Sequence, residues 1–166
     1  EGRGAYYDSA GTLRDMVQSH LLQVLALIAM SIPITEHAAS LHREKYSIFS
    51  ALKFYPEKEN VALGQYKSYR ALSGVSKKSE TNTFAALKLF IDRESWYRVP
   101  IYIRTGKMLN TKHTYVVIEF KKFAFQAKED QPNRLIVELG PKERATIKLL
   151  NKIRGKAQYL DISTVN

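Results

Sequence analysis

The chain has 166 residues, of which 45% are hydrophobic and 25% charged. That is enough for one globular domain with a hydrophobic core. It contains no cysteine, which excludes disulfides and thiolate chemistry and fits a reducing compartment such as the cytoplasm. No apolar run reaches the roughly 18 to 20 residues that a membrane helix needs. The formal net charge of +10 favours an anionic partner, or it simply keeps the protein soluble.

The first predicted element is a helix that begins after Thr12 and ends before Pro33. Its apolar stripe at helical spacing consists of Leu13, Met16, Val17, Leu21, Val24 and Ile28, together with His20. Thr12 is the expected N-cap, and Asp15 resembles the acidic residue of a capping box. A second helix is expected from about residue 36 to residue 53.

From residue 61 the hydrophobic period changes to two, which is typical of β-strands. Strands are expected over 61–66, 84–92, 99–104, 114–120, 135–140, 145–150 and 157–163. No helical pattern separates these strands, which favours antiparallel pairing. The predicted fold class is therefore α+β, with helices packed on one face of a large, mostly antiparallel sheet.

His20 is the first candidate for chemistry, because it stands at the start of a mostly apolar segment. It is either a core histidine with satisfied nitrogens or a general base, since imidazoles exchange protons near neutral pH. Asp15 either stabilises a helix N-terminus or holds a ligand hydroxyl. Five residues of α-helix span about 7.5 Å of rise and about 140° of rotation. Asp15 and His20 are therefore expected to border one pocket without a direct hydrogen bond, and a carboxylate that orients His20 would come from elsewhere.

The segment IRTGKMLNTK, residues 103–112, is the second candidate. A strand ends at Arg104, the chain turns, and Lys107 and Lys112 follow. Two ammonium groups around a turn suit a phosphate ligand, although an ordinary charged turn has the same pattern. No phosphate-binding Gly-rich loop, nucleophile elbow or zinc signature is present in the sequence, so no metal site is expected.

Four stretches of the sequence together resemble a known family. They are EGRGAYYDSAGTLRDMVQSHLLQVLALIAM, ALGQY, TNTFAALKLFID and WYRVPIYIRTGKMLN, in this order and at fitting intervals. They are similar to the C-terminal, substrate-binding domain of glucose-6-phosphate dehydrogenase, and the similarity runs from Glu1 to about Leu160. The resemblance implies that residues 1–166 form an incomplete C-terminal domain. The N-terminal coenzyme domain and the final C-terminal segment would be absent.

The resemblance also implies a reaction: NADP-dependent oxidation of glucose 6-phosphate to 6-phosphogluconolactone, the first step of the pentose phosphate pathway. His20 matches the base that removes the proton of the sugar C1 hydroxyl, and Asp15 matches an aspartate that holds sugar hydroxyls. Lys107 and Lys112 match basic residues of the substrate site. Arg104 matches an arginine that contacts a structural NADP in some members. Because the coenzyme would bind mainly on the missing N-terminal domain, the isolated chain is expected to be inactive.

Several positions depart from the family pattern. His113 and Val117 stand where members with a structural NADP carry basic residues, and Glu138 also replaces a basic residue. Gly140 stands where some members carry a glutamine that contacts the substrate. Members of the family usually form homodimers through the sheet, so a second copy of the chain is an expected partner beside glucose 6-phosphate.

Two other functions are compatible with the sequence. One is a non-catalytic module that binds a sugar phosphate or mediates dimerisation. The other is a basic nucleic-acid-binding domain, which rests on the net charge alone. The Lys and Arg residues are scattered and no nucleic-acid-binding motif accompanies them. The expected partners therefore include neither a nucleic acid nor a membrane.

Overall fold

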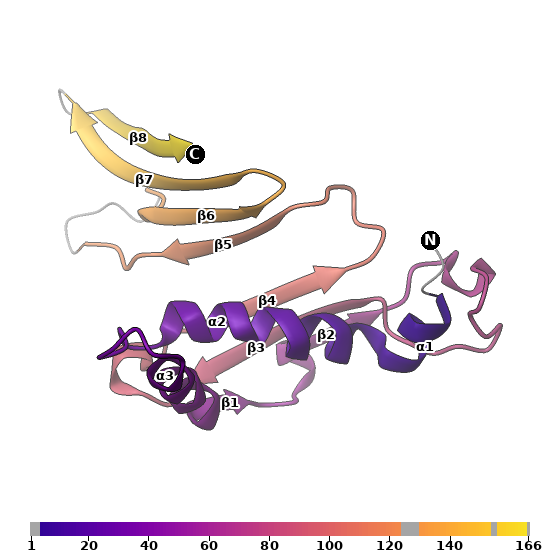
Figure 1. Ribbon diagram of the computed structural model, residues 1–166. Coiled ribbons are helices and arrows are strands. Elements are labelled where there is room, and N and C mark those ends of the chain that lie inside the picture. Colours follow the sequence, from indigo (N-terminus) through magenta and orange to yellow (C-terminus); the bar gives the residue numbers. More distant parts are fainter. Residues whose placement is uncertain (1–3, 124–129, 154–155, 166) are drawn as a thin grey trace. The chain divides into compact units, whose positions relative to one another are not determined.

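The computed structural model describes residues 4–123, 130–153 and 156–165 (Figure 1). The chain divides into two compact units, Glu1–Met108 and Leu109–Asn166. Within the described residues, each unit contains a four-stranded antiparallel sheet, and the helices belong to the first unit. The predicted α+β class with antiparallel pairing is confirmed. The strands of the described residues form two separate sheets, one in each unit.

Three helical segments open the first unit: α1 (Gly4–Thr12), η1 (Leu13–Leu21) and α2 (Leu22–Ala29). The sequence pattern predicted η1 and α2 as one helix and did not predict α1. Glu1, where the family resemblance begins, lies outside the described residues. None of the helices in the described part of the chain has the length and apolar character needed to cross a membrane.

The fourth helix, α3 (Ala38–Ala51), is shorter than predicted. Leu52 leaves the helix with an extended backbone, and residues Leu52–Phe54 form the short strand β1. The expected helix included residues 52 and 53, because their apolar and aliphatic character suits a helix face as well as a strand. Residues Leu52–Phe54 pair with residues 89–91 of a longer strand, and they therefore form β1 instead of a last helical turn.

The central strand of the first sheet is β3 (Phe84–Ile91). Strand β4 (Ile101–Gly106) pairs along one side of β3. Strands β1 and β2 (Val61–Gly64) pair with the other side, β2 near the start of β3 and β1 near its end. The predicted strands of this unit are confirmed to within two residues at each end, whereas β1 was not predicted.

Helices α2 and α3 pack on the first sheet around the buried side chains of Ala26, Ile48 and Ile91 (Figure 1). Trp96 follows β3, and its indole N–H donates to the Ala29 carbonyl oxygen at 2.9 Å. These contacts fix α2 against the sheet. The helix that precedes it, η1, contacts β4, so the end of β4 lies beside η1.

The second unit is an antiparallel meander with the strand order β5-β6-β7-β8. Its strands are β5 (Thr114–Glu119), β6 (Arg134–Gly140), β7 (Glu143–Ile153) and β8 (Lys156–Val165). All four predicted strands of this region are confirmed.

The two faces of the second sheet differ in polarity. The register places one set of apolar residues on a single face: Val116, Ile118, Leu135, Val137, Leu139, Ala145, Ile147, Leu149, Leu160 and Ile162. We call this set the apolar face. The opposite face carries two ion pairs, Arg134–Glu119 at 2.9 Å and Arg144–Glu138 at 3.6 Å. This opposite face is mixed, because the register also places Val117, Ile136 and Leu150 on it.

Candidate functional site

The junction between α1 and η1 is a sharp kink at Gly11. Its backbone has φ 70° and ψ 169°, a conformation essentially restricted to glycine. Thr12 follows and is buried, with a helical backbone. Its N–H and its hydroxyl both donate to the carbonyl oxygen of Asn82, at 3.2 and 2.6 Å. Thr12 thus occupies the predicted N-cap position of η1, but its side chain makes no capping hydrogen bond and instead ties η1 to the segment before β3.

The segment η1 is wound as a π-helix. Its backbone hydrogen bonds join residues five apart, whereas those of an α-helix join residues four apart. The Leu22 N–H, for example, donates to the Val17 carbonyl oxygen. Residues five apart, such as Asp15 and His20, thus lie closer to a common face than α-helical rotation would place them. The predicted rotation between these two residues is wrong for this reason.

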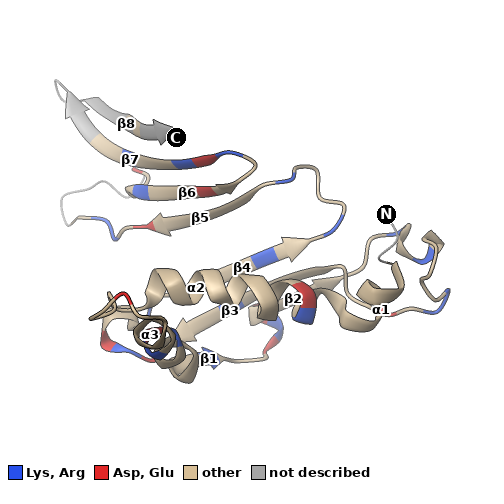
Figure 2. Ribbon diagram, viewed as in Figure 1, with Lys and Arg blue, Asp and Glu red and all other residues tan. Residues whose placement is uncertain are grey.

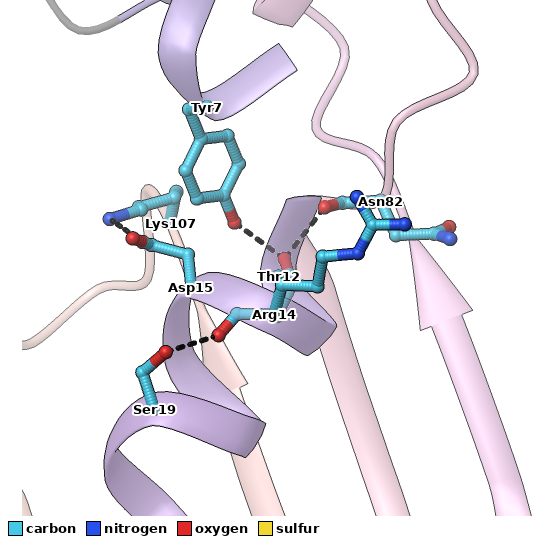
Figure 3. Close-up of polar contacts among 7 residues, drawn as sticks. All are labelled: Tyr7, Thr12, Arg14, Asp15, Ser19, Asn82 and Lys107. Carbon is cyan, nitrogen blue, oxygen red and sulfur yellow. Dashed lines mark hydrogen bonds and ion pairs between the residues drawn. The ribbon is translucent and has the colours of Figure 1, made fainter. Parts of the chain in front are cut away.

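Asp15 and Lys107 form the charged centre of the site (Figure 3). The Lys107 Nζ lies 3.8 Å from Asp15 Oδ2, and the side chains are 46% and 21% exposed, respectively. Asp15 has Lys107 as its partner, so the capping-box role expected from the sequence is not realised. An ion pair this open to solvent contributes at most about 1 kcal/mol to stability. Its two charges remain accessible to a polar ligand.

Two contacts fix Lys107 at the end of β4. Its backbone N–H donates to the Thr83 carbonyl oxygen at 2.8 Å, which continues the pairing of β3 with β4 past Gly106. Its Nζ lies 4.8 Å from the centroid of the Tyr7 ring. Lys107 is thus held at its backbone by the sheet and at its ammonium group by residues of α1 and η1.

His20 is exposed near the end of η1. The interpretation of His20 as a core histidine is therefore wrong, and its ring is free to meet a ligand. Within the described residues, the ion pair of Asp15 is with Lys107, and none joins Asp15 to His20. An orienting carboxylate for the ring is not supplied by the described part of this chain.

Arg104 and Lys112 flank Lys107 in the sequence and differ in their setting. Arg104 is exposed on β4, opposite Ala86 of β3, while its neighbour Ile103 is buried. Lys112 belongs to the second unit and is exposed on the segment before β5. Among the predicted residues of the first unit, the structure brings Asp15 and Lys107 together.

A second polar centre lies around Asp8 and was not predicted from the sequence. The Asp8 carboxylate accepts hydrogen bonds from the hydroxyls of Ser79 and Tyr69 and from the Ser76 N–H. The Asp8 carbonyl oxygen accepts one from the Thr81 hydroxyl at 2.7 Å. The hydrogen bond from Ser79 is the main cause that holds the Asp8 pKa below its usual value. These bonds attach α1 to the loop before β3, a long-range contact that no local pattern signals.

The helices, the antiparallel sheets and the charged centre of the described residues define a domain of the α+β class. The family model described as "Glucose-6-phosphate dehydrogenase, C-terminal domain" matches residues 1–166, so the chain belongs to this family. The resemblance inferred from the sequence is therefore confirmed.

Curated relatives carry the corresponding name. Glucose-6-phosphate 1-dehydrogenase 3, chloroplastic, from Arabidopsis thaliana is 36% identical over 100% of this chain and 31% of its own length. Glucose-6-phosphate 1-dehydrogenase from Buchnera aphidicola subsp. Schizaphis graminum is 39% identical over 93% of this chain and 35% of its own length. The chain thus spans about a third of the length of the curated relatives it matches.

Solved structures share the fold. The crystal structure of glucose-6-phosphate 1-dehydrogenase from Mycobacterium avium matches with a TM-score of 0.88 and 34% identity, over 99% of this chain and 37% of that one. A glucose-6-phosphate dehydrogenase in complex with its substrate glucose-6-phosphate matches with a TM-score of 0.88 and 32% identity, over 99% of this chain and 36% of that one.

Proposed function

We propose that this chain supplies the substrate site and the catalytic base of an NADP-dependent glucose-6-phosphate dehydrogenase. The enzyme would oxidise glucose 6-phosphate to 6-phosphogluconolactone, the first step of the pentose phosphate pathway. The observation that carries the proposal is that η1 exposes His20 and also carries Asp15, whose carboxylate pairs with Lys107 at 3.8 Å. One structural relative is a complex with its substrate glucose-6-phosphate, a molecule that has both hydroxyls and a phosphate to bind.

The roles follow from the chemistry of each group. His20 accepts the proton of the sugar C1 hydroxyl while hydride leaves C1, and an exposed imidazole can reach such a proton. The Asp15 carboxylate accepts hydrogen bonds from sugar hydroxyls. Lys107 provides a positive charge for the anionic end of the substrate, and Lys112 is proposed as a further contact. Holding these groups in a fixed geometry lowers the entropic cost of the reaction.

NADP would supply the hydride acceptor and would bind mainly on an N-terminal domain of the whole enzyme. A structural NADP is a different matter, because its phosphates need several cations. Arg104 is exposed and would suit one of them. In the second unit, however, Arg144 is already paired with Glu138 at 3.6 Å, and Glu138 repels phosphate. We propose that these residues do not hold a structural NADP.

Steady-state kinetics of the full-length enzyme test the proposal. The variant His20→Ala should lower kcat by at least about a hundredfold, the contribution of a general base. The matched control is His42→Ala, since His42 is exposed on α3 and has no proposed role. Near-normal turnover of His20→Ala would refute the assignment. We expect the isolated chain to bind glucose 6-phosphate in calorimetry and to form no NADPH when NADP is added.

We also propose that the enzyme forms a homodimer through the second sheet. Support comes from the apolar face, on which Ile147 and Ile162 remain exposed within the described residues. A twofold axis would pair this face with its own copy. Ile147→Lys should convert dimers to monomers in sedimentation equilibrium. Tyr115→Lys on the opposite face should not, and an unchanged dimer in Ile147→Lys would refute this interface.

Binding to nucleic acid finds no support in the arrangement of charge. In Figure 2, Lys and Arg are spread over helices, strands and loops of both units, with Asp and Glu among them.

We propose a cytoplasmic location, since one relative is the cytoplasmic isoform from Solanum tuberosum, while other relatives are chloroplastic. Imaging a fluorescent fusion of the full-length protein in its own cells would test the location.

A further inference from the structure

Tyr7 of α1 places its ring against the ammonium group of Lys107. The Tyr7 side chain is buried, at 7% exposure, and Lys107 Nζ lies 4.8 Å from its ring centroid. A cation within about 6 Å of an aromatic face is attracted by the ring quadrupole. With Asp15 Oδ2 at 3.8 Å from the same nitrogen, the ammonium group has two partners, a carboxylate and a ring (Figure 3).

The hydroxyl of Tyr7 has a defined role as a donor. It lies 2.5 Å from Thr12 Oγ1. The single hydroxyl proton of Thr12 goes to the Asn82 carbonyl oxygen at 2.6 Å, so the proton between Tyr7 and Thr12 must come from Tyr7. Burial raises the Tyr7 pKa, and the nearby negative charge of Asp15 raises it further. Tyr7 therefore stays neutral at physiological pH and keeps donating this proton.

The same hydrogen bonds lead back to the backbone of Lys107. Thr12 holds the carbonyl oxygen of Asn82, and the carbonyl oxygen of the next residue, Thr83, accepts the Lys107 N–H at 2.8 Å. The ring of Tyr7 thus contacts the ammonium group of Lys107, while its hydroxyl is linked through Thr12 to the segment before β3 that holds the Lys107 backbone.

We infer that Tyr7 is a positioning residue that sets the affinity for the sugar phosphate through Lys107. This inference rests on the proposed role of Lys107 in substrate binding. The competing view is that Tyr7 only fills space, since it also packs edge-to-face against Tyr69, with the ring centroids 6.2 Å apart. A space-filling role would affect stability and would not depend on the side chain at position 107.

Kinetics of the full-length enzyme separate the two views. Tyr7→Leu removes the ring and should raise KM for glucose 6-phosphate by about threefold to thirtyfold, the range expected for a lost cation–π contact. Tyr7→Phe keeps the ring but loses the hydrogen bond to Thr12, so it should raise KM less than Tyr7→Leu does. Tyr46→Leu, which removes an exposed ring on α3, is the control and should leave KM unchanged.

A double-mutant cycle with Lys107→Met provides the readout that packing alone would not move. If Tyr7 acts through Lys107, Tyr7→Leu should change KM little once Lys107→Met is present. An equal effect of Tyr7→Leu in both backgrounds would overturn the inference, as would an unchanged KM in Tyr7→Leu. If Lys107→Met itself leaves KM unchanged, the proposed substrate role of Lys107 fails, and the inference fails with it.

A measurement on the wild-type ring contact does not depend on how well the variants fold. After reductive methylation with a ¹³C label, the Lys107 methyl resonance, assigned with Lys107→Arg, should be shifted upfield by the ring current of Tyr7. A Lys107 resonance at the position typical of solvent-exposed lysines would overturn the inference.

Discussion

The ammonium group of Lys107 lies 3.8 Å from the carboxylate of Asp15 and joins the end of β4 to the π-helix η1. The same sheet carries a second pair of similar geometry, Lys53–Asp92 at 3.9 Å, near the opposite end of β3. Both pairs are open to solvent, so neither contributes much to stability. The first pair differs because its ammonium group lies against the buried ring of Tyr7, and because η1 also exposes His20.

The two pairs provide a matched test of substrate recognition. In the full-length enzyme, Asp15→Asn should lower kcat/KM for glucose 6-phosphate by about tenfold to a hundredfold, the value of lost hydrogen bonds to a charged acceptor. Its melting temperature should hardly change, because the pair is exposed. Asp92→Asn is the control and should change neither quantity. Equal kinetics for both variants would contradict the role of Asp15.

Sequence periodicity predicted the elements that carry the site but not their details. The apolar stripe from Leu13 to Ile28 is compatible with both α- and π-helices, because it fixes which side is buried and not the hydrogen-bond register. The pairing of Asp15 with Lys107 depends on how η1 packs beside β4. Such long-range contacts leave no local signal, and only the family resemblance grouped the two residues beforehand.

Tyr7 and Asp8 are two further residues whose long-range contacts could not be predicted from the sequence. Both lie on α1, whose short sequence GAYYDSAGT has two glycines and no clear apolar stripe. Their partners, Lys107 and the loop that includes Ser79, are far along the chain. A buried tyrosine and a multiply bonded aspartate become recognisable only when the fold brings these partners to α1.

Asp8 makes stability dependent on pH in a definite direction. Because its folded pKa is lowered, chiefly by the Ser79 hydroxyl, its contribution is fully present above the unfolded pKa of about 3.9. That contribution is lost as the pH falls through the folded pKa. In urea unfolding, the wild type should exceed Asp8→Asn in midpoint at pH 7, and the difference should vanish near the folded pKa.

The variant Ser79→Ala tests the cause of this shift. It removes the largest of the interactions that lower the Asp8 pKa, so the carboxyl should titrate at higher pH than in the wild type. The titration can be followed by the ¹³C chemical shift of the Asp8 carboxyl. An unchanged titration midpoint in Ser79→Ala would mean that another group dominates.

Gly11 should tolerate no side chain, and the reason is its backbone and not a lack of space. A Cβ at this position would meet only Thr81 Cγ2 at 3.5 Å, an ordinary contact. The φ of 70° with ψ of 169° is costly for any other residue, at about 1 to 3 kcal/mol. Gly11→Ala should lower the free energy of unfolding by this amount in denaturant titrations.

Gly64 offers the control for Gly11. It lies in β2 without a positive φ, and a Cβ there would be 3.8 Å from the Phe84 Cβ. Gly64→Ala should therefore leave stability nearly unchanged. If Gly11→Ala were equally harmless, the kink between α1 and η1 would not require glycine.

The Thr12 hydroxyl accepts a hydrogen bond from the Tyr7 hydroxyl and donates one to the Asn82 carbonyl oxygen, so it links these two residues. Thr12→Val keeps the shape of the side chain but leaves the Tyr7 hydroxyl without its acceptor in a buried site. Such an unsatisfied group costs about 1 to 3 kcal/mol. Thr12→Ser retains the hydroxyl and should lose less stability than Thr12→Val.

Because the backbone N–H of Thr12 still donates to Asn82, Thr12→Val should fold, and its KM for glucose 6-phosphate should rise in the full-length enzyme. A stable Thr12→Val enzyme with wild-type KM would show that the Lys107 ammonium keeps its place without the link through Thr12.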